Sequence, residues 1–309
     1  MADVVVLGGN GFIGAHVVDR LVVDGHRVAV FGRPRSAPPR YRSADVTVIE
    51  GDFANTADLR AAVRGAEIVI HLLSTTTPAS AEADASVDVR TNVIQSIALL
   101  ESCVEAAVGH VYFASTGGAI YGSQGRSSYA ETDPTEPVSP YAIGKLAIEG
   151  YLRYFHAVAG LRSTALRISN PYGPGQQSHR RQGFIPIALR AILEGRPMTR
   201  YGDGSMVRDY LYVEDLADMF SVLVRRVPER FVYNLGSGLG VTVDEVIDAL
   251  RRVCDMPFTV EDRPTPVTFV DRVVLDSTRF RSEFGDLELT ALDEGIRRTL
   301  HAMRAEPRG

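Results

Sequence analysis

The chain has 309 residues, with 45% hydrophobic residues, 23% charged residues and a formal net charge of −5. These values are typical of a globular protein, and the lack of a basic tract argues against nucleic acid as its main partner. The two cysteines, Cys103 and Cys254, are far apart and no Cys/His cluster occurs, so we expect neither a disulfide framework nor a metal site. The chain opens on a short apolar run and contains no long apolar segment, so we expect a cytoplasmic protein with no membrane partner.

The first fourteen residues predict a strand that passes through glycines into a helix. The apolar run Val4–Leu7 is followed by Gly8-Gly9-Asn10-Gly11-Phe12-Ile13-Gly14 and then by an amphipathic stretch. Two glycine spacings fit, Gly9-x-Gly11-x-x-Gly14 and Gly8-x-x-Gly11-x-x-Gly14. In a strand–turn–helix context such a turn lets the backbone approach a pyrophosphate, which the free N–H groups of the helix then bind. We therefore predict a dinucleotide site.

The second predicted strand, Arg27–Phe31, is followed by Gly32, Arg33 and Arg35. A carboxylate that binds the adenosine ribose hydroxyls is expected at this place, about 20 residues after the glycines. None is present, and two arginines would attract a 2′-phosphate. This pattern favours NADP(H) over NAD, unless the arginines belong to a solvated loop without a specific role.

Further strands are predicted at Val46–Glu50 and Glu67–Leu73, with a short helix around Leu59 and Val63. Asp52 follows the first of these strands, where a carboxylate can reach the adenine amino group. Hydroxyl residues follow the second, and Thr75 and Thr76 are candidates for a ligand crevice because parallel sheets bind ligands at their carboxyl ends. A polar loop is the alternative interpretation.

Alternating strands and helices continue to about residue 170 and predict a Rossmann-type, doubly wound parallel sheet. The next helix is predicted over Asp88–Val108, and another begins at Tyr141 and passes Phe155. We expect residues 1–170 to form the dinucleotide-binding domain, joined again by about 211–240. Residues 171–309 are then mainly a smaller, mixed α/β substrate domain. The other predicted strands are 111–114, 163–169, 198–201, 207–213 and 231–235, and the other helices are 185–194 and 242–253.

Tyr141 and Lys145 form the predicted catalytic pair. They are four residues apart and share one face of a helix. Lys145 is the only lysine among 33 basic residues, which indicates a position where arginine does not serve. A nearby ammonium lowers the pKa of a phenol, which can then exchange a proton with a carbinol oxygen. A hydroxyl at the end of the preceding strand would orient the carbonyl, and Ser115 and Thr116 are the candidates.

With these elements in hand, the chain resembles the extended short-chain dehydrogenase/reductases, in the branch of nucleotide-sugar epimerases, dehydratases and ketoreductases. The resemblance covers nearly the whole chain. The motifs that carry it are the glycine turn, Gly51-Asp52, His71-Leu72, Asn92, Tyr121-Gly122, Tyr141-x-x-x-Lys145, Asn170-Pro171-Tyr172-Gly173, Gly202-Asp203-Gly204, Arg208-Asp209-Tyr210 and Val213-Glu214-Asp215.

The resemblance implies roles for these positions. Tyr141 is the acid/base and Lys145 its partner, while Asn170 and Arg208 face a nucleotide-sugar diphosphate. Helices around Asn92–Val108 and Tyr141–Phe155 imply a homodimer through a four-helix bundle. Apart from the resemblance, we expect the loops around 75–77, 176–184 and 201 to determine which sugar binds, with Thr75, Thr76, Phe184 and Tyr201 as candidate substrate contacts. The cofactor positions are Gly8, Gly11, Phe12, Ile13, Gly14, Gly32, Arg33, Arg35, Asp52, Phe53, Leu72, Asn92, Tyr141 and Lys145.

The chain departs from the family pattern at three places. Gly117 stands where a serine or threonine usually precedes Tyr-Gly by four residues, Gly118-Ala119 replace the Asp-Glu of the dehydratases, and Gly32 replaces the aspartate of NAD-dependent epimerases. We therefore expect an NADPH-dependent ketoreductase acting at C4 of a dTDP- or UDP-linked keto-deoxysugar. An NAD-dependent 4-epimerase of UDP-hexoses is the alternative, and a non-catalytic NADP-binding protein is a distant third.

Overall fold

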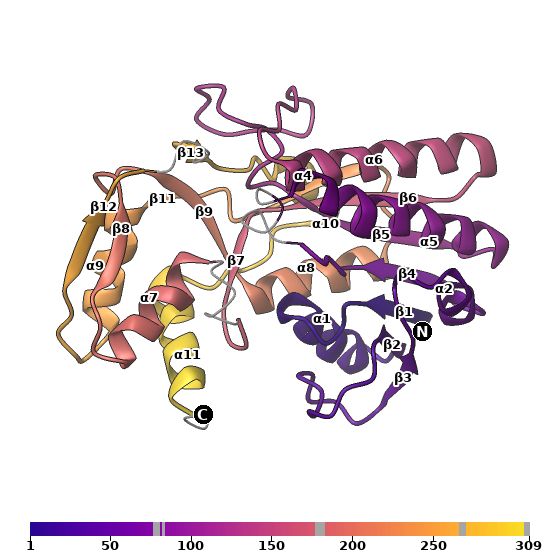
Figure 1. Ribbon diagram of the computed structural model, residues 1–309, viewed down its shortest axis with the longest axis horizontal. Helices are drawn as coiled ribbons and strands as arrows, with labels where there is room; N and C mark the ends of the chain where they lie inside the picture. The colour runs from indigo at the N-terminus through magenta and orange to yellow at the C-terminus, as the bar shows by residue number, and fades with distance from the viewer. Residues whose placement is uncertain (77–80, 82–83, 177–182, 266–269, 306–309) are drawn as a thin grey trace. The chain divides into compact units, whose positions relative to one another are not determined.

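The computed structural model describes residues 1–76, 81, 84–176, 183–265 and 270–305 (Figure 1). The chain forms two compact units. The first contains Met1–Thr116, Pro137–Arg167 and Ala217–Tyr233, and the second contains Gly117–Glu136, Ile168–Leu216 and Asn234–Gly309. Each unit is described by itself below.

A seven-stranded sheet forms the centre of the first unit, in the order β10-β6-β5-β4-β1-β2-β3. The pairings β1 with β2, β1 with β4, β2 with β3 and β4 with β5 are all parallel. The predicted Rossmann-type sheet is therefore confirmed. Its strands are β1 (Asp3–Leu7), β2 (Arg27–Gly32), β3 (Val46–Glu50), β4 (Ile68–His71), β5 (His110–Thr116), β6 (Ser163–Ile168) and β10 (Val232–Leu235).

Helices cover both faces of this sheet (Figure 1). Buried residues of α2, α5 and α6 pack on one face, with Leu59, Leu99 and Ile148 among them. On α8, Leu223 accepts a hydrogen bond at its carbonyl from Tyr112 of β5, at 2.6 Å. The helices are α1 (Phe12–Val23), α2 (Thr56–Val63), α4 (Ala85–Asp88), α5 (Ile94–Glu105), α6 (Pro140–Ala159) and α8 (Val213–Arg225).

The boundaries of α6 follow from local sequence signals. Ser139 caps the first turn by accepting a hydrogen bond from the Ala142 amide at 3.3 Å, and Pro140 occupies the first turn. At the other end Gly160 adopts the left-handed conformation (φ 68°) that closes helices. The helix is therefore longer than the predicted Tyr141–Phe155 stretch, and it holds Tyr141 in its first turn.

The prediction of one continuous helix over Asp88–Val108 is wrong, because this stretch forms three consecutive helical segments. A π-helical segment, η1 (Val89–Val93), separates α4 from α5. The physical reason is a stripe of buried polar residues, Asp88, Asn92 and Ser96, which the apolar period of the sequence does not reveal. π-Bulges of this kind are frequent at functional sites.

The second unit contains shorter elements around a core of its own. Leu189, Ile192, Ile247 and Leu250 are buried in this core. Its strands are β7 (Asn170–Tyr172), β8 (Met198–Tyr201), β9 (Val207–Tyr212), β11 (Gly240–Thr242), β12 (Val260–Arg263) and β13 (Arg272–Val273). Its helices are α7 (Phe184–Leu193), α9 (Val243–Val253), α10 (Thr278–Phe284) and α11 (Leu292–Ala305). Among the described residues, no helix has the length and apolar character needed to cross a bilayer.

Candidate active site

The glycine turn brings β1, α1 and the end of β4 into close contact. Gly8 has a φ of +87°, and a Cβ added there would lie 2.9 Å from the backbone nitrogen of Leu73. A Cβ on Gly14 would lie 2.2 Å from the carbonyl oxygen of Gly8. Only glycine fits both positions. A Cβ on Gly9 would lie 2.6 Å from Cγ2 of Val30, so sterics favour glycine in both of the spacings that the sequence offers.

The turn fits the pyrophosphate of a dinucleotide. Gly11 caps α1 without a side-chain hydrogen bond, and no acidic residue lies in the first turn of the helix. The amides of Phe12 and Ile13 are thus left for an anion, as at any uncapped helix N-terminus. The Oδ1 atom of Asn10, buried in this turn, also lacks a partner among the described residues. These features fit the predicted cofactor positions at Gly8, Gly11, Phe12, Ile13 and Gly14.

Gly32 ends β2 at the position where a ribose-binding carboxylate was expected, and the space beside it is open. A Cβ on Gly32 would meet no atom within 4 Å. Arg33 and Arg35 are exposed, and neither forms an ion pair with a described residue. Both side chains follow Gly32 closely in the chain, and both are exposed, so they could reach an anion bound at the end of β2.

The segment after β3 is held by its own hydrogen bonds. Asp52 is exposed, and its Oδ1 accepts a hydrogen bond from the Ala54 amide at 2.9 Å. Phe53 is buried, and its ring centroid lies 5.4 Å from that of His71. Asp52 can still offer its other oxygen to a ligand, whereas Phe53 is a core residue.

Tyr141 and Lys145 lie one turn apart on α6, near the carboxyl end of β5. Lys145 is buried, and its Nζ donates a hydrogen bond to the carbonyl of Ala114 at 2.8 Å. The same Nζ lies 5.7 Å from the centre of the Tyr141 ring. Within the described part of the chain, the Tyr141 hydroxyl makes no hydrogen bond. The phenol is therefore free to meet a ligand, and the ammonium keeps two further protons to donate.

The electrostatics of this pair differ from the sequence-based prediction. Burial raises the pKa of Tyr141 to about 12, and the negative charge of Asp88 adds to this effect. Burial lowers the pKa of Lys145 to about 8, while Asp88 opposes that decrease. The prediction that the ammonium gives the phenol a low pKa is therefore wrong for the protein alone. Desolvation outweighs the attraction, and the tyrosine is protonated at neutral pH.

Ser115 takes part in a buried network that the sequence analysis missed. Its hydroxyl donates to Glu149 at 2.6 Å, and Glu149 also binds the guanidinium of Arg167 at 3.1 Å and 2.8 Å. All three residues are buried. Glu149 lies four residues after Lys145, and this spacing is the signal from which the network could have been found.

Thr116 is the better candidate for the hydroxyl that orients a carbonyl. It is the last residue of β5, and its Oγ1 has no hydrogen-bond partner among the described residues. The neighbouring position cannot serve, because a Cβ on Gly117 would lie 2.4 Å from Cδ1 of Leu275. Leu275 thus fills the space of the missing hydroxyl residue.

Substitutions of the two hydroxyl residues should separate their roles. We expect Thr116→Val to lower kcat about 100-fold, because one donor to a developing oxyanion is lost. Ser115→Ala should instead destabilise the protein by about 1–3 kcal/mol, because a buried carboxylate loses a donor. Steady-state kinetics and urea unfolding of both variants provide the check. A larger loss of kcat in Ser115→Ala than in Thr116→Val would reverse the assignment.

The polar residues after β4 bind one another. The Asn92 side chain accepts from the Thr75 amide at 2.9 Å and from its hydroxyl at 3.0 Å, and donates to Thr76 at 2.8 Å. Thr76 in turn donates to Asp88. Asn92 and Thr76 are buried and engaged within the protein, so they support the loop. Leu72 and Thr75 are less buried and remain able to contact a ligand. Residue 77 lies outside the described residues.

The predicted diphosphate residues lie in the second unit. Asn170 donates from Nδ2 to the carbonyl of Asp209 at 3.2 Å, at the pairing of β7 with β9. Arg208 donates to the carbonyls of Val207 at 2.9 Å and Asp271 at 3.4 Å, and no described carboxylate pairs with it. Burial lowers the pKa of this guanidinium, so its charge is poorly compensated. An anion such as a diphosphate suits it.

Two further predicted substrate residues also lie in the second unit. Phe184 begins α7 and packs partly against the core, and Tyr201 ends β8 with 39% of its surface exposed. Residues 177–182, which precede Phe184, are outside the described residues.

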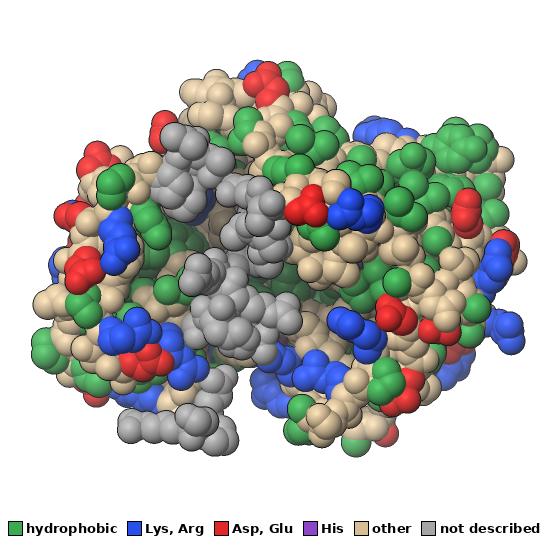
Figure 2. All heavy atoms as spheres, in the orientation of Figure 1, with side chains coloured by type: hydrophobic (Ala, Val, Ile, Leu, Met, Phe, Trp, Pro, Cys, Tyr) green, Lys and Arg blue, Asp and Glu red, His purple; other side chains and the backbone are tan. Residues whose placement is uncertain are grey.

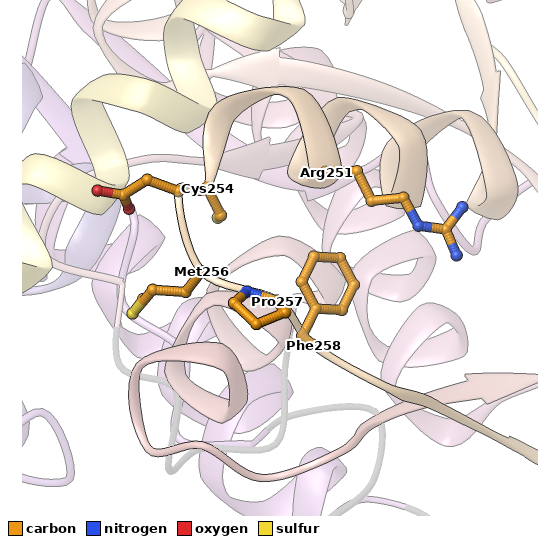
Figure 3. A pocket seen from close by; sticks show the side chains of 6 residues that line it. Arg251, Cys254, Met256, Pro257 and Phe258 are labelled. Atoms are coloured by element: carbon orange, nitrogen blue, oxygen red, sulfur yellow. The ribbon is translucent and has the colours of Figure 1, made fainter.

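A shallow hollow of about 340 Å³ lies at the end of α9 in the second unit (Figure 3). None of the predicted site residues lines it. Burial raises the pKa of Cys254, which keeps this thiol protonated. The hollow is lined by Arg251, Cys254, Asp255, Met256, Pro257 and Phe258. Across the described residues, no group of three or more His, Cys, Asp or Glu side chains is placed to bind a metal ion.

Residues 4–236 match the model of the NAD dependent epimerase/dehydratase family, and the chain belongs to this family. It is 32% identical over 306 residues to a UDP-glucose 4-epimerase of Mycolicibacterium smegmatis, covering 97% of each chain. It is 29% identical over 238 residues to a dTDP-4-dehydro-6-deoxyglucose reductase of Escherichia coli, covering 77% of this chain and 75% of the relative. The structure of the UDP-glucose 4-epimerase of Thermus thermophilus in complex with NAD matches with a TM-score of 0.90 and 32% identity, covering 98% and 99% of the two chains.

The protein is therefore an enzyme of the nucleotide-sugar epimerase, dehydratase and reductase type. The resemblance inferred from the glycine turn and the Tyr141–Lys145 pair is confirmed at the level of the family. Relatives named as epimerases and as reductases both occur, so the family alone does not choose between these reactions.

Proposed function

We propose that the protein is an NADPH-dependent ketoreductase that acts on the C4 keto group of a dTDP- or UDP-linked deoxysugar. The single observation that carries this choice is the open space beside Gly32, flanked by the exposed Arg33 and Arg35. An aspartate there would repel a 2′-phosphate, whereas two guanidinium groups attract it. The relative named as a dTDP-4-dehydro-6-deoxyglucose reductase is in line with this proposal.

The glycine turn and Lys145 would hold NADPH, which when bound would supply the hydride for the new C–H bond at C4. Tyr141 donates its phenolic proton to the carbonyl oxygen, which becomes the hydroxyl of the product. Its high pKa ensures that the proton is present at neutral pH. Lys145 stabilises the phenolate that remains until solvent returns a proton, and Thr116 donates a hydrogen bond to the carbonyl oxygen.

We assign the remaining predicted residues to binding. Arg208 pairs with the diphosphate, and Asn170 contacts the same group. Leu72 and Asp52 line the cofactor in the first unit, while Thr75, Phe184 and Tyr201 contact the sugar or the base. Asn92, Thr76, Phe53 and Ser115 support these residues from within the fold. In this proposal the second unit is the substrate domain.

An NAD-dependent 4-epimerase is the second candidate function. Epimerases are named among the relatives, and one of the similar structures is a complex with NAD. An epimerase would keep its cofactor bound and return the same hydride to the other face of the sugar. The two functions therefore differ in which dinucleotide the protein prefers and in whether that cofactor is consumed.

Cofactor binding is the test of this proposal. We expect the purified wild-type protein to bind NADPH more tightly than NADH, and Arg33→Ser to weaken NADPH binding about 10–100-fold because a charge-assisted contact is lost. NADH binding should not change. Fluorescence titration measures both affinities, and Arg64→Ser, at an exposed arginine after α2, is the matched control. Tightly bound NAD without any preference for NADPH would contradict the ketoreductase and favour the epimerase.

We also propose that the protein is a homodimer through η1, α5 and α6. Hydrophobic side chains gather on the outer face of these helices (Figure 2). An apolar surface of this kind is typical of an interaction site. We expect light scattering to give about twice the chain mass of 33.6 kDa, and a mass near 33.6 kDa would contradict the dimer. The exposed residues are Val89, Ile94, Ile143, Tyr151, Tyr154 and Val158.

A further inference from the structure

Asp88 is buried against the turn of α6 that carries Tyr141 and Lys145. Only 2% of its surface is exposed. A Cβ on Gly144 would lie 1.8 Å from Oδ2 of Asp88, so the carboxylate occupies the space in which any other residue 144 would place its side chain. Gly144 immediately precedes Lys145. The carboxylate therefore packs onto the backbone between the two members of the catalytic pair.

The other carboxylate oxygen is held by neutral donors. Thr76 donates its hydroxyl to Oδ1 of Asp88, and Asn92 donates to the same oxygen at 2.8 Å. No described lysine or arginine forms an ion pair or hydrogen bond with Asp88. Burying a carboxylate with neutral donors alone is costly, and a positive charge nearby would stabilise it.

Lys145 is the candidate cation, because it directly follows Gly144, onto which the Asp88 carboxylate packs, and its side chain is also buried. The negative charge of Asp88 acts in the direction that raises the pKa of Lys145 and of Tyr141. His71 is neutral, because burial and Lys145 lower its pKa to about 3. Glu149, one turn further along α6, is compensated by Arg167 of β6. Because His71 is neutral and Glu149 is paired with Arg167, Asp88 is the remaining negative charge of these three that can compensate the charge of Lys145.

We propose that Asp88 is the buried counter-ion of Lys145 and a positioning residue of the site, which keeps the lysine charged and the tyrosine protonated. The proposal rests on the proposed function in so far as Tyr141 and Lys145 are the proton-transferring pair. Asp88 does not touch the reacting atoms. It packs against Gly144 of α6, and only a glycine at position 144 leaves room for its carboxylate.

The single lysine of this chain permits a direct test. Full-length protein labelled with [ε-13C]lysine gives one lysine resonance, and its pH titration reports the charge of Lys145 alone. We expect Asp88→Asn to move the midpoint about one pH unit lower, because the ammonium loses a nearby negative charge. Asp84→Asn is the matched control, because it removes an exposed charge from the same segment and asparagine can still cap α4.

The titration tests the role of Asp88 separately from the proposed ketoreductase activity. The proposal is supported if the titration midpoint of Lys145 is lower in Asp88→Asn and unchanged in Asp84→Asn, even if the protein reduces no sugar. An unchanged midpoint in Asp88→Asn, or an equal fall in Asp84→Asn, overturns it. If Asp88→Asn fails to fold, Asp88→Ala with Gly144→Ser fills the same space with a neutral hydroxyl. This double variant must show the same fall, and an unchanged midpoint again overturns the proposal.

Discussion

Replacing Tyr141 by phenylalanine should lower kcat about 1000-fold while leaving cofactor affinity and stability nearly unchanged. The hydroxyl makes no hydrogen bond with a described residue, so its removal leaves no buried partner unsatisfied. What is lost is the proton donor of the proposed reaction, and general acid catalysis of this kind contributes about 100- to 10,000-fold. NADPH oxidation with 4-keto nucleotide sugars measures kcat, and fluorescence titration measures the affinity.

Tyr151→Phe is the matched control for this experiment. Tyr151 lies on the same helix, and 39% of its surface is exposed. Phenylalanine keeps the ring that belongs to the proposed dimer surface and removes only a hydroxyl far from the reaction, so kcat should change less than twofold. Full activity in Tyr141→Phe would contradict the acid/base role. A protein that binds NADP without catalysis would lose nothing in either variant.

The second large effect is expected on stability, from the buried pair of Glu149 and Arg167. Arg167→Met should reduce the free energy of unfolding by about 3–5 kcal/mol, because it leaves a carboxylate buried without its cation. The side chains of the pair are 3% and 5% exposed, so solvent cannot compensate the remaining charge. Urea unfolding at neutral pH measures the loss.

Two comparisons isolate the cause of this loss. Glu149→Leu combined with Arg167→Met should recover most of the stability, because no uncompensated charge remains. Arg60→Met breaks an exposed pair with Glu105 and should change the free energy of unfolding far less, because exposed ion pairs contribute little to stability. A loss in Arg167→Met no larger than in Arg60→Met would show that Glu149 is not desolvated as the structure indicates.

The parts of the fold that the sequence predicted well are those with strong local signals. The apolar β-strands and the glycine turn fix the parallel sheet, and Asn55, Ser139 and Thr242 cap three of the predicted helices. The π-helical segment was not predicted, because the polar residues around it, Asp88 and Asn92, find their partner in Thr76, which comes from another part of the chain: Thr76 donates to Asp88 and accepts from Asn92. The short strands β11 and β13 were missed for a similar reason, since each exists only by pairing with β9.

The candidate site shows the same division. Spacing on one helix identified Tyr141 and Lys145, and strand order placed Ser115 and Thr116 nearby. The partners of each side chain could not be predicted. Ser115 is bound by Glu149, whereas Thr116 has no such partner among the described residues, and no pattern in the sequence distinguishes the two hydroxyls. The pKa of Tyr141 was misjudged because charge was weighed without burial, and burial has the larger effect here.

The first unit is built from three separate stretches of chain, and the last of them, Ala217–Tyr233, supplies most of α8 and the start of the edge strand β10. During synthesis the sheet therefore stays incomplete until about three quarters of the chain has left the ribosome. Until then β6 is an unprotected edge, with backbone groups open to pairing with other chains. A fragment that ends near residue 170 would keep that edge permanently exposed, so we expect it to aggregate through β6 when it is expressed alone.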